Sequence, residues 1–107
     1  MSEFVDYLPE LFLELGSVST RKMFGGYGIF YDGLMIGLVA DQRLYLKADS
    51  QSAPIFSESG LSQFQYPKGD KLVGMSYYLA PEEALEDPSE MREWAQIAYE
   101  AALRSRK

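Results

Sequence analysis

The first residues that invite a chemical interpretation are those of KMFGGYGIFYDG, Lys22 to Gly33, which hold four glycines in twelve positions. Glycine-rich runs bind phosphate where they join a strand to a helix N-terminus, because free N–H groups meet the anion there. Here the run continues into IFYDG, which is typical of a strand that ends in a hairpin turn. The sequence therefore predicts a structural bend or bulge between strands, formed by Met23, Phe24, Gly25, Gly26 and Gly28.

Few other residues suggest catalysis. The chain has neither histidine nor cysteine, which excludes the common nucleophile–base pairs and soft metal sites. The acidic residues of PEEALED precede a helix, where interaction with the helix dipole explains them. Tyr45 and Lys47 fall on one strand face, and a lysine lying along an amphipathic strand is the ordinary account of such a pair. The sequence therefore predicts no catalytic residue, no metal site and no cofactor.

Basic and aromatic residues gather in the middle of the chain. The formal net charge is −6, which opposes binding to a phosphate backbone. A local basic patch is nevertheless expected, and its candidate interaction residues are Arg21, Lys22, Arg43, Tyr45 and Lys47. Tyrosines beside such a patch can stack on single-stranded bases, but no RNP-like motif accompanies them. We expect weak, salt-sensitive nucleic-acid binding at most.

The elements that position these residues follow from hydrophobic periodicity. Residues 2–15 have the spacing of an amphipathic helix, with Ser2 as N-cap and Gly16 as the stop. Three or four antiparallel strands are expected over residues 17–48, with turns at Asp32-Gly33 and Asp41-Gln42. A short helix within 50–60, two strands within 63–80 and a helix from Asp87-Pro88 complete the chain.

The resulting order is α-β-β-β-α-β-β-α, which predicts a two-layer α+β fold with an antiparallel sheet and a single domain over residues 1–107. The N-terminal segment carries acidic residues and no long apolar run, so we expect no export signal, no membrane span and a location in the cytoplasm. The strands carry apolar or aromatic residues on both faces. Ile29 and Tyr31 are expected on one face and Phe30 on the other, and Met35 is expected on the face opposite Ile36 and Leu38. We therefore expect a two-fold homodimer formed through the sheet or a strand edge; the alternative is that the last helix covers the second face and the chain is monomeric.

Two segments resemble a known family. Arg21 to Asp49, RKMFGGYGIFYDGLMIGLVADQRLYLKAD, is similar to the opening motif of the N-terminal domain of the TfoX/Sxy family of bacterial competence regulators. Met75 to Ala102, MSYYLAPEEALEDPSEMREWAQIAYEAA, resembles the closing segment of that domain. In full-length members the domain precedes a C-terminal helical domain, and the protein acts with the cyclic-AMP receptor protein. This chain ends after the first domain, so it is either a stand-alone member, which the ending SRK favours, or a truncated one.

The resemblance implies a non-enzymatic regulatory or protein-interaction domain, with a transcription complex as the candidate partner. It supplies no catalytic residues. The alternative is a small-ligand-binding protein or enzyme with a pocket near the Gly25–Gly28 bend that uses Tyr45 and Lys47. A deep pocket lined by polar groups with perturbed protonation would favour the alternative, whereas a shallow apolar surface would favour the interaction domain.

Overall fold

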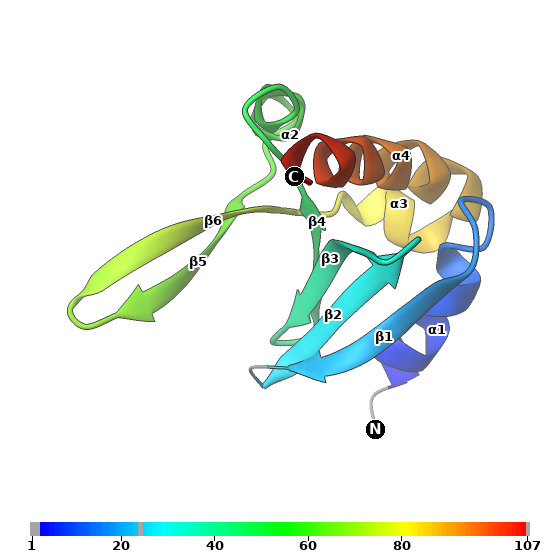
Figure 1. The fold of residues 1–107 in the computed structure, drawn as a ribbon, viewed down its shortest axis with the longest axis horizontal. Helices are drawn as coiled ribbons and strands as arrows, with labels where there is room; N and C mark the ends of the chain where they lie inside the picture. The colour runs from blue at the N-terminus through cyan, green and yellow to red at the C-terminus, as the bar shows by residue number, and fades with distance from the viewer. Residues whose placement is uncertain (1–2, 24, 107) are drawn as a thin grey trace.

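A computed structural model describes residues 3–23 and 25–106 of the chain. Six antiparallel strands form one sheet in the order β1-β2-β3-β4-β6-β5 (Figure 1). The elements in chain order are α1 (Glu3–Leu11), β1 (Val18–Met23), β2 (Gly26–Tyr31), β3 (Leu34–Ala40), β4 (Arg43–Lys47), α2 (Ala53–Glu58), β5 (Gln63–Lys68), β6 (Lys71–Leu79), α3 (Glu82–Glu86) and α4 (Pro88–Ser105).

The predicted α+β class and the order of helices and strands are confirmed. Of the three or four strands expected before the middle helix, the structure has four. A short helix, α3, also precedes α4, where only an acidic approach to the last helix was expected. The residues of α3 are acidic at both ends, and Ala84 alone is buried. Its five residues are too few to produce a recognisable apolar period.

Both expected hairpin turns are present. Asp32 and Gly33 join β2 to β3 with φ of 54° and 77°, and Asp41 and Gln42 join β3 to β4 with φ of 53° and 62°. Two consecutive residues at positive φ match the right-handed twist of the flanking strands, which is why such turns are preferred in two-residue hairpins. These turns fix the register of the three central strands.

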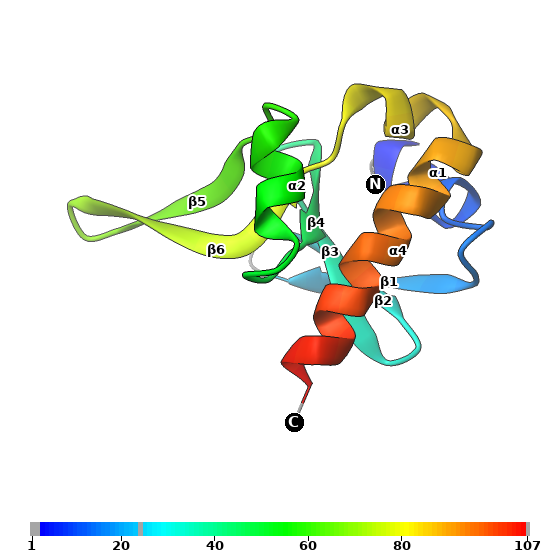
Figure 2. The same ribbon diagram turned by 90° about the horizontal axis from the view of Figure 1, so that it is seen from above.

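The helices pack on one face of the sheet. Figures 1 and 2 show α4 crossing this face, with α1 beside it and α2 next to β6. Helix α4 begins as expected, because the Asp87 side chain accepts a hydrogen bond from the Ser89 N–H at 3.0 Å. The largest fully buried side chains form a single core between the helices and the sheet: Leu8, Leu11, Phe12, Ile29, Ile36, Leu44, Leu46, Phe56 and Met91.

The first helix is shorter than expected. It ends at Leu11, and not near Leu15, although it contains Pro9 without interruption. Turns follow, in which the N–H groups of Phe12, Leu15 and Gly16 still bond to carbonyls of the preceding turn. Phe12 remains completely buried. The spacing of apolar residues therefore predicts correctly that Phe12 is buried, but it predicts a helix that extends beyond its actual end at Leu11. The expected Ser2 cap lies outside the described residues.

A β-bulge in β3 changes which side chains face the helices. Ile29 pairs with Gly37 and Phe30 pairs with Met35, so Ile36 is the extra residue opposite β2. Ile36 is part of the core, whereas Leu38 is buried outside the core cluster. The expectation that Ile36 and Leu38 share one face is wrong, because a bulge reverses the alternation beyond it. Leu38 instead shares the second face with Met35.

The last hairpin extends away from the rest of the sheet. Strands β4 and β6 pair only at Tyr45–Leu79, Leu46–Tyr78 and Lys47–Tyr77. The remainder of β6 runs beyond β4 and pairs only with β5, so the two strands form a projecting ribbon (Figures 1 and 2). No helix among residues 3–23 and 25–106 is long and apolar enough to cross a membrane.

A polar cluster fastens the end of β4 to both flanking helices. The Asp49 carboxylate accepts hydrogen bonds from the Ser52 N–H at 3.0 Å and from Arg104 Nη2 at 3.0 Å, at the C-terminal end of α4. The Arg104 hydrogen bond is the main reason that the pKa of Asp49 lies well below its usual range, and the Ser52 donors act in the same direction. This cluster stabilises the packing of α4 on the sheet.

Candidate functional site

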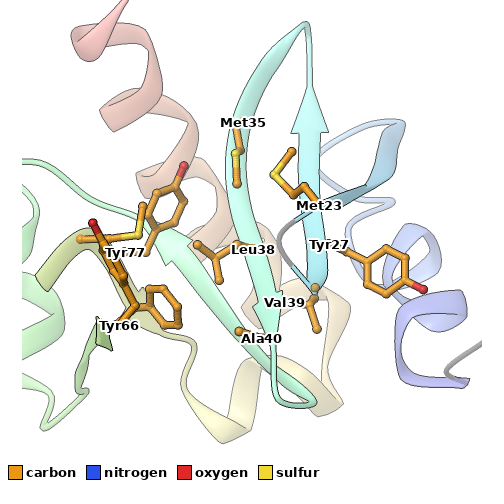
Figure 3. A pocket seen from close by; sticks show the side chains of 11 residues that line it. Met23, Tyr27, Met35, Leu38, Val39, Ala40, Tyr66 and Tyr77 are labelled. Atoms are coloured by element: carbon orange, nitrogen blue, oxygen red, sulfur yellow. The ribbon is translucent and has the colours of Figure 1, made fainter. Parts of the chain in front are cut away.

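The face of the sheet away from the helices carries a groove with a volume of about 510 Å³. None of its lining residues comes from a helix. Strands β1, β2 and β3 form one side, and the β5–β6 ribbon forms the other (Figure 3). The lining residues are Met23, Gly26, Tyr27, Met35, Leu38, Val39, Ala40, Phe64, Tyr66, Met75 and Tyr77.

Register explains the floor of this groove. Arg21 pairs with Gly28, Gly28 with Leu38, and Leu38 with Tyr45, so these four residues lie in one row across four strands on the same face. Gly28 has no side chain, and the Met23 side chain occupies the space above it: a Cβ at Gly28 would lie 3.1 Å from Met23 Cε. Figure 3 shows Met35 and Leu38 on the groove side of β3, with Tyr66 and Tyr77 across from them, whereas the Tyr27 ring extends away.

The glycine-rich run forms a hairpin and precedes no helix. Met23 pairs with Gly26, so a two-residue turn connects β1 to β2, with Gly25 at φ +77°. Phe24 lies outside the described residues. Gly26 permits a close approach of strands: a Cβ there would lie 2.0 Å from the carbonyl oxygen of Val39. The requirement at Gly26 is therefore space beside β3, and not an unusual φ.

Gly37 and Gly74 each interrupt a strand pattern, which predicts either a bulge or room for a large neighbour such as Trp94 or Tyr45. A Cβ at Gly37 would lie 3.0 Å from the Tyr45 carbonyl oxygen. The atom that comes close to Gly37 therefore belongs to the backbone of Tyr45 and not to its side chain. A Cβ at Gly74 would lie 2.8 Å from the Gln63 side chain. The register of β5 and β6 shifts between Gln63 and Gln65, so Gly74 lies beside an irregularity of the ribbon.

The structure divides the candidate interaction patch. Arg21, Arg43, Tyr45 and Lys47 lie on the groove face, as alternation and register require. Lys22 pairs with Tyr27 and lies on the opposite face of β1. The apolar row through Gly28 and Leu38 separates Arg21 from the other patch residues.

Two of these cations lie over aromatic rings. The guanidinium carbon of Arg21 is 4.8 Å from the centre of the Phe30 ring, and Lys47 Nζ is 5.2 Å from that of Tyr77. Burial raises the pKa of the Tyr77 phenol, which makes this group a weaker acid than a solvated tyrosine. The groove is thus lined mainly by apolar and aromatic side chains.

Polar networks elsewhere fasten elements together. Tyr99 on α4 donates a hydrogen bond to Asp32 Oδ2 at 2.8 Å, which raises the pKa of the Tyr99 phenol and links α4 to the β2–β3 turn. No three Asp or Glu side chains in the described part of the chain lie close enough to hold a metal ion. These polar groups support the fold and lie away from the groove.

Comparison with known proteins gives a family match over most of the chain. The profile of the TfoX N-terminal domain matches residues 10–102. This chain belongs to the TfoX N-terminal domain family. It is 31% identical over 87 residues to DNA transformation protein TfoX1 of Aliivibrio fischeri, a match that covers 81% of this chain and 42% of the relative. It is 27% identical over 97 residues to protein Sxy of Escherichia coli, which covers 91% of this chain and 46% of Sxy.

The chain therefore spans less than half the length of these curated relatives. The match includes every strand of the sheet and hence the whole groove. The bend at Met23 and Gly26 was predicted from the sequence. The sequence did not predict a site at the other groove residues, which include Met35, Leu38, Tyr66, Met75 and Tyr77. Alternation along the ribbon places Met75 and Tyr77 on one face, but only the pairing of β6 with β4 brings them opposite β3.

Proposed function

We propose that this chain is a non-enzymatic regulatory domain that binds a protein partner through the groove face of its sheet. The observation that carries the proposal is the groove itself: an open apolar surface built from the one face of the sheet that the helices leave uncovered. Apolar surface of this kind is commonly a binding site in a folded protein. A cytoplasmic location is part of the proposal.

The composition of the groove favours a protein partner over the alternative of an enzyme or small-ligand site. Its volume of about 510 Å³ falls within the range of small-molecule sites. Such sites, however, usually orient the ligand through several converging polar groups. Here the polar side-chain atoms are phenol hydroxyls, and Tyr45 and Lys47 do not line the groove.

The relatives suggest the process in which the domain acts. One of them is named a DNA transformation protein, and Sxy shares the same domain. We propose that the chain takes part in transcriptional control of competence as a partner within a transcription complex. Recognition of DNA is then left to other components of the complex, since the net charge of −6 opposes tight binding.

A homodimer is the second part of the proposal. Leu72 on the projecting ribbon is 67% exposed and lies on the ribbon face opposite Met75 and Tyr77. A two-stranded ribbon is marginally stable alone and gains stability when it packs on another surface. We propose that two ribbons pack together through this outer face, which leaves both grooves free.

Light scattering at micromolar concentration tests the dimer. The unaltered chain should give twice the chain mass of 12.1 kDa, and the Leu72→Lys variant should give the mass of one chain. A concentration-independent mass of 12.1 kDa for the unaltered chain would refute the dimer.

Site-specific photo-crosslinking in the native bacterium tests the proposed function. The variant Met35→p-benzoylphenylalanine places the crosslinker in the groove, and Gln96→p-benzoylphenylalanine places it on the exposed face of α4 as a control. We expect a protein adduct with the first variant that is absent with the second. An adduct with a small molecule only, read from the intact mass, would support the alternative. Equal labelling at both positions would contradict the proposed function.

A further inference from the structure

Charge is strongly segregated between the sheet and the helices. The described strand residues include no Asp or Glu, but they include six cations: Arg21, Lys22, Arg43, Lys47, Lys68 and Lys71. The acidic residues lie in the helices, the turns and the loops. A chain with a formal charge of −6 therefore presents a sheet whose side chains are only neutral or positive.

Three of the cations lie on the groove face of the sheet, one on the outer strand β1 and two on β4, which lies between β3 and β6. Arg21 projects from β1, and Arg43 and Lys47 project from β4, all on the groove face. Three strand spacings separate β1 from β4, which is about 14 Å. None of these three cations forms an ion pair with another residue of the described chain, whose single salt bridge joins Arg104 to Asp49. Their charges are therefore available to a ligand.

Four aromatic rings of this face are poorly placed to stack on nucleic-acid bases, whereas Tyr66 is 37% exposed. Arg21 covers Phe30, and Lys47 covers Tyr77, which is 7% exposed. Tyr45 and Phe64 pack edge to face with their centres 4.9 Å apart. Base stacking requires open ring faces. The face therefore fits a ligand that brings apolar side chains and negative charges better than one that brings bases.

Methionines make the groove adaptable. Met23, Met35 and Met75 all line it, and they are three of the five methionines in the chain. Methionine side chains are unbranched and polarisable, so they repack readily around apolar groups of different shape. A groove of this composition is suited to side chains of a peptide segment.

We propose that the groove binds a short acidic segment of a partner protein. Apolar side chains of the segment fill the space between Leu38 and Tyr66, and its carboxylates pair with Arg21, Arg43 and Lys47. This inference rests on the proposed function and specifies the chemistry of the partner.

Peptide display tests the inference directly. A library of random twelve-residue peptides is selected against the full folded chain at low ionic strength. We expect enriched peptides to carry more Asp and Glu than the starting library, interspersed with large apolar residues. Enrichment without an acidic bias, or no enrichment on a chain shown to be folded, would overturn the inference.

A matched variant then tests the role of the cations. The Arg43→Glu/Lys47→Glu variant replaces no residue that lines the groove, and an enriched peptide should bind to it about tenfold more weakly by fluorescence anisotropy. The difference should shrink as salt is raised, because partly exposed charges are screened. Equal affinities for the two chains would contradict the proposed pairing.

Competition separates this inference from the proposed function. A thymidine dodecamer that binds the groove more tightly than the enriched peptide would assign the face to nucleic acid and overturn the inference. A protein adduct at Met35 in the crosslinking experiment, combined with no acidic bias in the selection, would leave the proposed function in place and reject only the acidic partner.

Discussion

Replacing Gly26 with alanine should destabilise the fold severely, although alanine adds a single methyl group. The new Cβ would lie 2.0 Å from the Val39 carbonyl oxygen, a backbone atom, whereas real Cβ contacts are essentially never shorter than 3.0 Å. Strands β2 and β3 would have to separate by about 1 Å at the Tyr27–Val39 pair. We estimate a cost of about 3 kcal/mol from overpacking and a weakened ladder hydrogen bond. A midpoint fall of about 15 °C corresponds to this value.

Gly25 and Gly28 provide the matched controls. Gly25 has φ +77° but no atom within 4 Å of an added Cβ, so Gly25→Ala should cost about 1 kcal/mol from backbone strain alone. At Gly28 the nearest atoms belong to the Phe30 and Met23 side chains, which can move, so Gly28→Ala should cost less than Gly26→Ala. Urea unfolding monitored by circular dichroism gives all three values. If Gly26→Ala is as stable as Gly25→Ala, the close approach of β2 and β3 is wrong.

Three further outcomes are expected. Asp49→Ala should lower unfolding stability by about 1 kcal/mol by urea titration, since it removes the acceptor for the Ser52 N–H, whereas Asp49→Asn keeps an acceptor and should lose less. Because Arg104 lowers the pKa of the folded Asp49 carboxyl, this carboxylate stabilises the fold fully at pH values above the usual aspartate pKa of about 3.9. The difference in unfolding free energy between the unaltered chain and Asp49→Asn should therefore narrow as the pH falls below that value. A difference that does not change with pH would show that Asp49 is not paired with Arg104. Binding to duplex DNA should be weak and should disappear as salt is raised in an electrophoretic assay, and tight sequence-specific binding by the chain alone would contradict the charge argument.

The sequence was sufficient to predict those turns and helix ends whose conformation depends on a few neighbouring residues. Asp32-Gly33 predicts a hairpin because both positions accept positive φ, and Asp87-Pro88 predicts a helix start because the carboxylate caps an N–H group. For the bulge at Ile36 the sequence offered one signal, Gly37 inside a strand pattern, which indicates either a bulge or room for a large neighbour. Alternation alone cannot locate an extra residue in a uniformly apolar strand.

The groove was harder to predict than the fold because it depends on long-range pairing. Its two sides come from residues about 40 positions apart, Met35 and Met75 among them. They meet because β6 pairs with β4 over three residue pairs and then extends beyond it. The sequence indicated a local basic patch but could not reveal that an apolar row lies between Arg21 and the other patch residues.

Chemical-shift mapping tests the central claim most directly. The ¹⁵N-labelled chain is titrated with an enriched acidic peptide or with the partner identified by crosslinking, and amide resonances are followed. Binding at the groove should perturb residues of β3 around Leu38 and of the ribbon around Met75 and Tyr77, and should leave the exposed face of α4 around Gln96 unchanged. Perturbations centred on α4 or α1, with β3 and the ribbon unaffected, would contradict the assignment of the uncovered sheet face as the binding surface.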